Sequence, residues 1–130
     1  MTNYNFSSLA DKWWDPNGAM KALHDINTIR AGFIEDQAPY PQQNTLIDIG
    51  CGAGILCETM AKSGYQVTGV DISKELIKTA ISHAKIDNLT IDYLHMDLNQ
   101  LSTKKQQFDI ITCLELIEHI DSPHQLIQTC

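Results

Sequence analysis

Short apolar segments alternate with segments of helical spacing along much of this chain, and this alternation constrains the fold more than any other feature. Four segments have the character of buried strands, at residues 45–49, 66–70, 89–94 and 108–113. Helical periodicity follows the first of them over 55–62, and Ser73 is placed to cap a helix that runs to about Lys85. Strands and helices that alternate at this spacing form parallel βαβ units. The sequence therefore predicts an α/β fold built on a doubly wound sheet.

The N-terminal third of the chain lacks this strand pattern. Apolar residues recur there at near-helical spacing, at Ala22, Leu23, Ile26, Ile29 and Ile34. Two prolines, Pro39 and Pro41, then stop any helix and make 38–44 a connector. We therefore expect a helical segment with its connector over 1–44, and the α/β domain over 45–130.

Three glycines at alternate positions, Gly50, Gly52 and Gly54, lie where the first predicted strand turns into a helix. Glycine lets the backbone approach a ligand closely, and the start of a helix attracts a carboxylate or phosphate. Asp71 ends the second predicted strand, where a doubly wound fold places the acid that accepts the ribose hydroxyls of an adenosine cofactor. The combination predicts such a cofactor. The alternative is that the glycines only permit a tight turn.

Asp48, two residues before the first glycine, bears on which adenosine cofactor is bound. The dinucleotide fingerprint G-x-G-x-x-G leaves space for a pyrophosphate, whereas this loop reads G-x-G-x-G. A carboxylate is unfavourable beside a pyrophosphate but suits a ligand with an ammonium and a sulfonium. The sequence therefore favours S-adenosylmethionine over NAD.

Charge and composition exclude several classes of protein. Nine Lys and Arg against sixteen Asp and Glu give a net charge of -7, which argues against a nucleic-acid partner. No apolar run approaches the roughly 18 residues that span a bilayer, and the first residues lack the pattern of a signal peptide. Four cysteines without C-x-x-C spacing predict free thiols in a reducing, cytoplasmic compartment.

Several motifs add a family resemblance to this interpretation. The run D-I-G-C-G-A-G at 48–54 resembles the first motif of class I S-adenosylmethionine-dependent methyltransferases. W-W-D-x-x-G at 13–18, L-H-x-I-N-x-x-R at 23–30 and C-L-E-L-I-E-H at 113–119 resemble, more specifically, the ubiquinone-biosynthesis O-methyltransferases. The resemblance implies a Rossmann-like, seven-stranded sheet. Because only about four strands are predicted, we expect an N-terminal portion truncated at its C-terminus, with most of the cofactor half and little of the substrate half.

The resemblance also implies roles for individual residues at the cofactor site. Arg30 matches an arginine that helps bind S-adenosylmethionine, and Asp97 matches an acid that meets the adenine amino group. A solvated turn aspartate is the alternative interpretation of Asp97. Leu114 matches a position, often methionine, that flanks the adenine. The predicted cofactor-binding set is Arg30, Asp48, Gly50, Gly52, Gly54, Asp71, Asp97 and Leu114.

Glu115, Glu118 and His119 share one face if their segment is helical. Two oxygens and one nitrogen suit a partly hydrated divalent cation such as Mg²⁺, Mn²⁺ or Zn²⁺. A metal there would lower the pKa of a phenolic oxygen and orient it for attack. Two alternatives stay open: His119 acts as a general base, or the acids only cap a helix.

The resemblance implies O-methylation of phenol and catechol hydroxyls in polyprenylated intermediates of ubiquinone synthesis, of the 2-polyprenyl-6-hydroxyphenol and 3-demethylubiquinol types. Two alternatives are another small-molecule class I methyltransferase and an inactive, truncated cofactor-binding fragment. A polyprenyl phenol or catechol substrate implies a site near a membrane, so peripheral association with its inner face, or with a biosynthetic complex, is expected of an otherwise cytoplasmic protein. The sequence predicts no particular oligomeric state.

Overall fold

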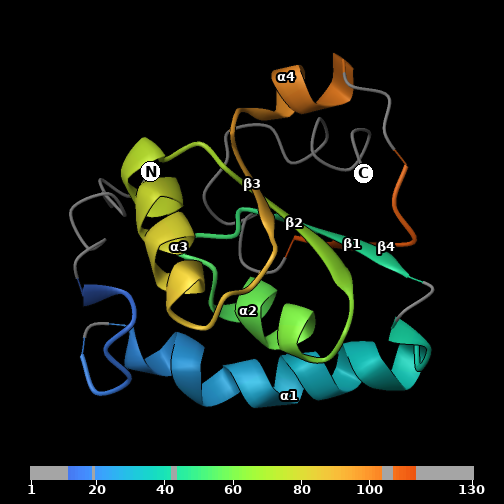
Figure 1. Ribbon diagram of the computed structural model, residues 1–130, viewed down its shortest axis with the longest axis horizontal. Helices are drawn as coiled ribbons and strands as arrows, with labels where there is room; N and C mark the ends of the chain where they lie inside the picture. Colours follow the sequence, from blue (N-terminus) through green and yellow to red (C-terminus); the bar gives the residue numbers. More distant parts are fainter. Residues whose placement is uncertain (1–11, 19, 42–43, 104–106, 114–130) are drawn as a thin grey trace.

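A computed structural model describes residues 12–18, 20–41, 44–103 and 107–113 (Figure 1). Its centre is a four-stranded parallel sheet with the strand order β3-β2-β1-β4. The strands are β1 (Thr45–Ile49), β2 (Gln66–Asp71), β3 (Asp92–His95) and β4 (Ile110–Thr112). This order confirms the predicted parallel α/β architecture.

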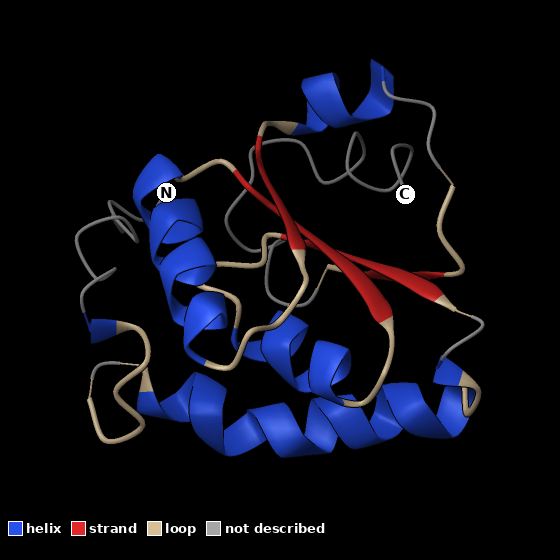
Figure 2. Ribbon diagram, viewed as in Figure 1, coloured by secondary structure: helices blue, strands red, loops and turns tan. Residues whose placement is uncertain are grey.

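Helices cover the sheet on both faces (Figure 2). They are α1 (Lys21–Gln37), α2 (Ile55–Lys62), α3 (Lys74–Ile86) and α4 (Leu98–Thr103). In the view of Figures 1 and 2, α2 lies between α1 and the sheet, and α4 lies on the opposite side of the sheet. Among the described residues, no helix is both long and apolar enough to cross a membrane.

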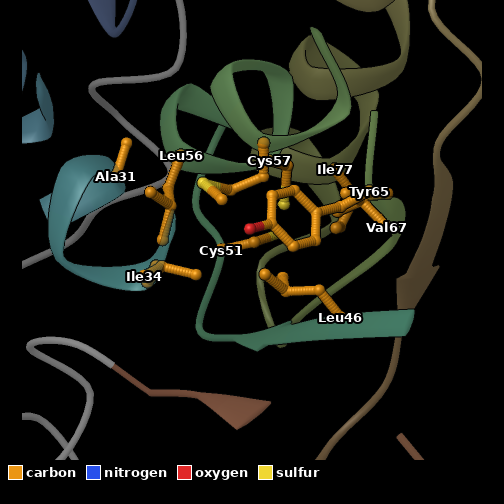
Figure 3. Packing of buried hydrophobic residues seen from close by; sticks show 10 residues of the cluster. Ala31, Ile34, Leu46, Cys51, Leu56, Cys57, Tyr65, Val67 and Ile77 are labelled. Atoms are coloured by element: carbon orange, nitrogen blue, oxygen red, sulfur yellow. The ribbon is translucent and has the colours of Figure 1, made fainter. Parts of the chain in front are cut away.

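The alternation of side chains along β1 supplies two separate parts of the core. Leu46 faces α1 and α2, where it joins a buried cluster that includes Ile34 and Leu56 (Figure 3). Ile47 and Ile49 belong to a second cluster, against which Leu101 of α4 packs. Because both faces of β1 are covered, this strand reads as an almost continuous apolar run, as buried parallel strands do.

The fourth strand is shorter than the predicted 108–113. The two larger differences from the sequence prediction both arise from helix caps. The third strand, expected to begin at residue 89, begins at Asp92, because Asn88 takes a positive φ of 54° and Leu89 donates its N–H to Ala84 O at 3.0 Å to close α3. Helix α4 was not expected. Asp97 and Gln100 exchange side-chain to backbone hydrogen bonds of 2.8 and 2.9 Å across its first turn, which is a capping box.

The strand order reverses at β1, and this reversal predicts where a ligand binds. The chain moves outward from β1 through β2 to β3 and then returns to place β4 on the other side of β1. In open α/β sheets, ligands bind outside the carboxyl ends of the strands at such a switch point. The glycine loop at residues 50–54 directly follows the carboxyl end of β1.

Candidate functional site

All three glycines of the 50–54 loop need the conformational freedom of glycine. Gly50, Gly52 and Gly54 have φ values of 77°, 59° and 92°, in the left-handed region that other residues rarely adopt. Gly54 is the residue before α2 and has Tyr93 directly against it, so that an added Cβ would lie 2.2 Å from the tyrosine oxygen. At Gly52 and Gly54 the loop is therefore a backbone ridge with no room for a side chain, because other side chains of the protein pack against it.

The backbone N–H groups of the loop are largely bound within the protein. Gly50 and Cys51 both donate to Val70 O, at 2.7 and 3.0 Å, and Gly54 donates to Cys51 O at 3.1 Å. Gly52 donates to the carboxylate of Asp71. Most of the backbone donors expected for a ligand therefore already have acceptors within the protein.

Asp71 connects the glycine loop to the end of β2. Its Oδ2 accepts from Gly52 N at 2.9 Å, and its Oδ1 accepts from Ser73 N at 2.8 Å, just before α3. Burial raises the pKa of Asp71, although the hydrogen bonds from Ser73 and Gly52 and the charge of His95 act in the opposite direction. The structure therefore brings together the loop and the acid that the sequence singled out.

Asp48 lies on β1 immediately below the loop and is only 5% exposed. Its Oδ1 accepts from the hydroxyl of Thr112 at 2.8 Å, and its Oδ2 accepts from the Cys57 thiol at 3.7 Å. Burial raises the pKa of Asp48 to about 7, while these two hydrogen bonds and the charge of Arg30 lower it. The carboxyl group is thus poised to ionise when a cation is placed near it.

The remaining predicted cofactor residues lie at different distances from this centre. Arg30, on α1, is half-buried and close enough for its charge to act on Asp48. Asp97 is exposed, follows β3, and caps α4 through Gln100. Leu114 lies outside the described residues. Of the predicted cofactor residues, those on β1, in the loop after it and at the end of β2 therefore lie closest together.

The predicted metal triad, Glu115, Glu118 and His119, also lies outside the described residues. Within residues 12–113, apart from the gaps given above, no group of three or more His, Cys, Asp and Glu side chains is arranged to hold a metal ion. No described cluster replaces the predicted triad.

Two tryptophans pack against the glycine loop. The helical periodicity of the sequence did not assign them to this site. Trp13 is 5% exposed, and its ring lies so close to Gly52 that an added Cβ would be 2.6 Å from Cζ2. Trp14 donates its Nε1–H to Ala53 O at 2.9 Å. Both residues thus contact the loop directly, as packing anchors. In the sequence, only the W-W-D motif draws attention to these tryptophans. Their contacts with the loop join residues far apart in sequence, so no local pattern predicts them.

The cysteine within the loop is not a nucleophile in this arrangement. Cys51 is buried, and its hydrogen bond with Cys57, together with burial, raises the pKa of its thiol well above the usual range. A protonated, buried thiol is unreactive. The described cysteines, Cys51, Cys57 and Cys113, are free, as the sequence predicts.

A hollow of about 560 Å³ lies elsewhere on the surface. Phe33, Tyr40 and Ile111 are among the residues that line it, together with residues that precede the amino ends of β1 and β4. The glycine loop is at the carboxyl end of β1, so this hollow is separate from the predicted site. None of the predicted cofactor residues lines it.

Known protein families and curated sequences include clear relatives of this chain. Residues 47–130 match the model of the family described as "Methyltransferase domain". The ubiquinone biosynthesis O-methyltransferase of Coxiella burnetii (strain RSA 493 / Nine Mile phase I) is 47% identical over 125 residues, which are 96% of this chain and 53% of that protein. The enzyme of the same name from Idiomarina loihiensis is 42% identical over 126 residues, covering 96% and 52%. The chain thus spans about half the length of these curated relatives.

Solved structures agree with the fold. The PH0226 protein from Pyrococcus horikoshii OT3 superposes with a TM-score of 0.76 at 23% identity, over 98% of this chain and 58% of that one. Magnesium protoporphyrin IX methyltransferase from Synechocystis PCC 6803, solved with bound SAH, superposes with a TM-score of 0.68 at 20% identity, over 86% and 53%. At these identities the likeness concerns the fold.

Proposed function

Because this chain belongs to the methyltransferase-domain family, we propose that it binds S-adenosylmethionine at the glycine loop and provides this site for O-methylation in ubiquinone biosynthesis. The observation that carries the proposal is the hydrogen bond between Asp71 Oδ2 and Gly52 N, 2.9 Å long, at the switch point of the sheet. It brings a carboxylate and a ridge of glycine backbone together where an adenosine ligand binds in folds of this kind.

The described side chains fit such a ligand. The carboxylate oxygens of Asp71 accept from backbone N–H groups that include those of Gly52 and Ser73, and a carboxylate has about four acceptor sites, so acceptor capacity remains for a ribose hydroxyl. Asp48, with its pKa near 7, favours an ammonium group, and Arg30 is the nearby cation for a carboxylate. S-adenosylmethionine, when bound, supplies an electrophilic methyl group.

The proposed substrates are the hydroxyl groups of polyprenylated phenols and catechols. The names of the relatives from Coxiella burnetii and Idiomarina loihiensis support this substrate class. A polyprenyl substrate also leads us to propose peripheral association with a membrane or a biosynthetic complex. Sedimentation with phospholipid vesicles tests the membrane part, and a protein that stays in the supernatant at all lipid concentrations contradicts it.

A divalent metal at Glu115, Glu118 and His119 remains part of the proposal. Those residues would hold the metal, which would favour the phenolate form of the substrate. Glu115→Ala and Glu118→Ala are expected to abolish metal-dependent methylation and to leave cofactor affinity unchanged. Unchanged methylation after removal of metal with a chelator contradicts this part.

Cofactor binding is tested first, by isothermal titration of the 130-residue chain with S-adenosylmethionine, S-adenosylhomocysteine and NAD. We expect saturable binding of the first two at one site and no binding of NAD. Heat from NAD alone contradicts the proposal and favours a dehydrogenase-like site. Absence of binding by all three contradicts it as well.

Turnover is tested separately, because the chain covers about half of the length of its relatives. The assay follows methyl transfer from labelled S-adenosylmethionine to a short-chain prenyl catechol. Methylation of that catechol supports the full proposal, whereas methylation only of unprenylated phenols supports another small-molecule methyltransferase. Cofactor binding without any transfer supports the alternative of a cofactor-binding fragment.

A further inference from the structure

A buried carboxylate on α2 depends on one imidazole for its polar contact. The side chain of Glu58 is 2% exposed, and its Oε2 lies 2.6 Å from Nδ1 of His83 on α3. Within the described part of the chain, Oε1 is buried without a hydrogen-bond partner. A buried carboxylate is costly unless it is hydrogen-bonded or paired. His83 is therefore held firmly in one orientation by Glu58.

The same imidazole stacks on a tryptophan of the N-terminal segment. The ring centroids of His83 and Trp14 are 3.6 Å apart and the rings are inclined by only 3°. His24 approaches the same indole edge-on, at 5.8 Å, and its Nε2 lies 2.8 Å from Trp13 O. Two imidazoles from two helices thus fix the position of one indole.

The tryptophan pair is in direct contact with the glycine loop. Trp14 is bound to Ala53 O through its indole N–H, and Trp13 packs directly over Gly52. Gly52 in turn donates to Asp71. A continuous series of contacts therefore leads from Glu58 and His83 through Trp14 to the residues of the proposed cofactor site.

We infer that His83 is a positioning residue for the cofactor site, which it serves by clamping Trp14, and with it residues 13–14, onto the glycine loop. This inference rests on the proposed function for its ligand, but the contacts of the clamp are all between groups of the protein itself. Coupling of this kind is reciprocal, so a ligand that orders the loop also tightens the tryptophan clamp. Neither the sequence motifs nor the comparisons assign this role to His83.

The test uses His83→Gln, which keeps a side-chain donor for Glu58 and removes the ring that stacks on Trp14. Lys78→Gln, at an exposed position of the same helix, is the matched control. The chain has only two tryptophans, so its tryptophan emission reports on residues 13 and 14 alone. In the ligand-free protein, we expect His83→Gln to shift that emission to longer wavelength and to speed amide hydrogen exchange of residues 50–54 at least fivefold. Lys78→Gln should change neither.

The second measurement is the dissociation constant of S-adenosylhomocysteine, followed by tryptophan emission. We expect His83→Gln to weaken binding about fivefold or more at a temperature where its urea unfolding curve shows it to be folded. The pair Glu58→Gln/His83→Phe restores a ring beside Trp14 without a buried charge, and it should recover most of the affinity. A purely structural role for His83 would change the unfolding midpoint but leave the affinity of the folded protein unchanged.

The outcomes separate the two proposals. Loss of ligand binding in the unmodified chain contradicts the proposed function, and the exchange and emission measurements still decide on the clamp. Unchanged exchange at residues 50–54 in His83→Gln overturns the inference. If His83→Gln does not fold, Trp14→Leu removes the stack from the other side, and amide hydrogen exchange of residues 50–54 is measured in that variant.

Discussion

The carboxylate of Asp48 on β1 accepts a hydrogen bond of 2.8 Å from the hydroxyl of Thr112 on β4, at the point where the strand order reverses. Thr112 is also buried, and its hydroxyl is 3.3 Å from Ile47 O. The contact therefore joins two strands that are 64 residues apart in sequence, directly below the glycine loop. It also places an ionisable group in a part of the core where charge is unfavourable.

Asp48 makes the stability of the fold depend on pH. Burial raises its pKa from 3.8 to about 7, so between these values the folded protein holds a proton that the unfolded chain releases. The free energy of unfolding therefore decreases as pH rises from about 4 to 7, by up to ~1.4 kcal/mol per pH unit from this group. Burial of Asp71 acts in the same direction. Urea unfolding at pH 5 and pH 8 measures the change.

Two variants assign this pH dependence to Asp48. Asp48→Asn cannot ionise, so the difference in unfolding free energy between pH 5 and pH 8 should be smaller than in the unmodified chain. Thr112→Val removes a hydrogen bond that lowers the pKa of Asp48, so the loss of stability, which begins at the pKa of the unfolded chain, should extend to higher pH. An Asp48→Asn variant with the full pH dependence shows that another group is responsible.

Gly52→Ala is expected to destabilise the fold by about 2 kcal/mol or more, because a Cβ at φ 59° is strained and would lie 2.6 Å from the Trp13 ring. Gly32→Ala is the matched control, since Gly32 lies within α1 with nothing within 4 Å of an added Cβ. It should stabilise the protein by roughly 0.5–1 kcal/mol. Urea unfolding of both variants checks the contrast, and equal effects would show that the tryptophan does not limit the space at Gly52.

The cap of α3 provides a prediction on local structure. Ser73 accepts from Leu76 N at 3.3 Å, so Ser73→Ala should lower the free energy of unfolding by about 1 kcal/mol. Ser82→Ala, at an exposed position in the same helix, should be neutral or slightly stabilising. Urea unfolding monitored by circular dichroism measures both. If the two variants are equally stable, the cap contributes nothing measurable.

Local signals in the sequence were sufficient for much of the fold. The predicted bounds of β1 and α2 agree with the structure, and Ser73 is the predicted cap of α3. The strand and helix patterns of β1 and α2 are bounded by glycines, which fixes their ends in the sequence. The start of α3 follows from its capping residue. The missed helix α4 had a signal of its own, because Asp97-x-x-Gln100 is a capping pattern.

Long-range contacts were beyond such patterns. Glycine spacing and the position of Asp71 predicted that the loop and the acid share a site, and their 2.9 Å hydrogen bond follows from parallel pairing of β1 and β2. The stack of Trp14 on His83 has no counterpart in any local pattern, because it depends on how α3 and the N-terminal segment pack. Residues that act through such packing are found only from the structure.

Asp71→Asn tests the proposed ligand contact and the loop together. Replacing the carboxylate by an amide removes the charge and one acceptor, and it places an N–H₂ group beside either Gly52 N or Ser73 N, both of which need an acceptor. A hydrogen bond to a charged group contributes about 1.5–3 kcal/mol, so binding of S-adenosylhomocysteine should weaken roughly tenfold or more. Isothermal titration of both proteins at the same pH measures the change.

Asp92→Asn is the matched control for this variant, because Asp92 is exposed and begins β3 at the edge of the sheet away from the loop. It removes the same charge, so a general effect of net charge on affinity would appear in both variants. We expect the affinity of Asp92→Asn to equal that of the unmodified chain. If both variants bind S-adenosylhomocysteine as tightly as the unmodified chain, Asp71 serves only to hold the glycine loop, and the ribose contact must be sought elsewhere.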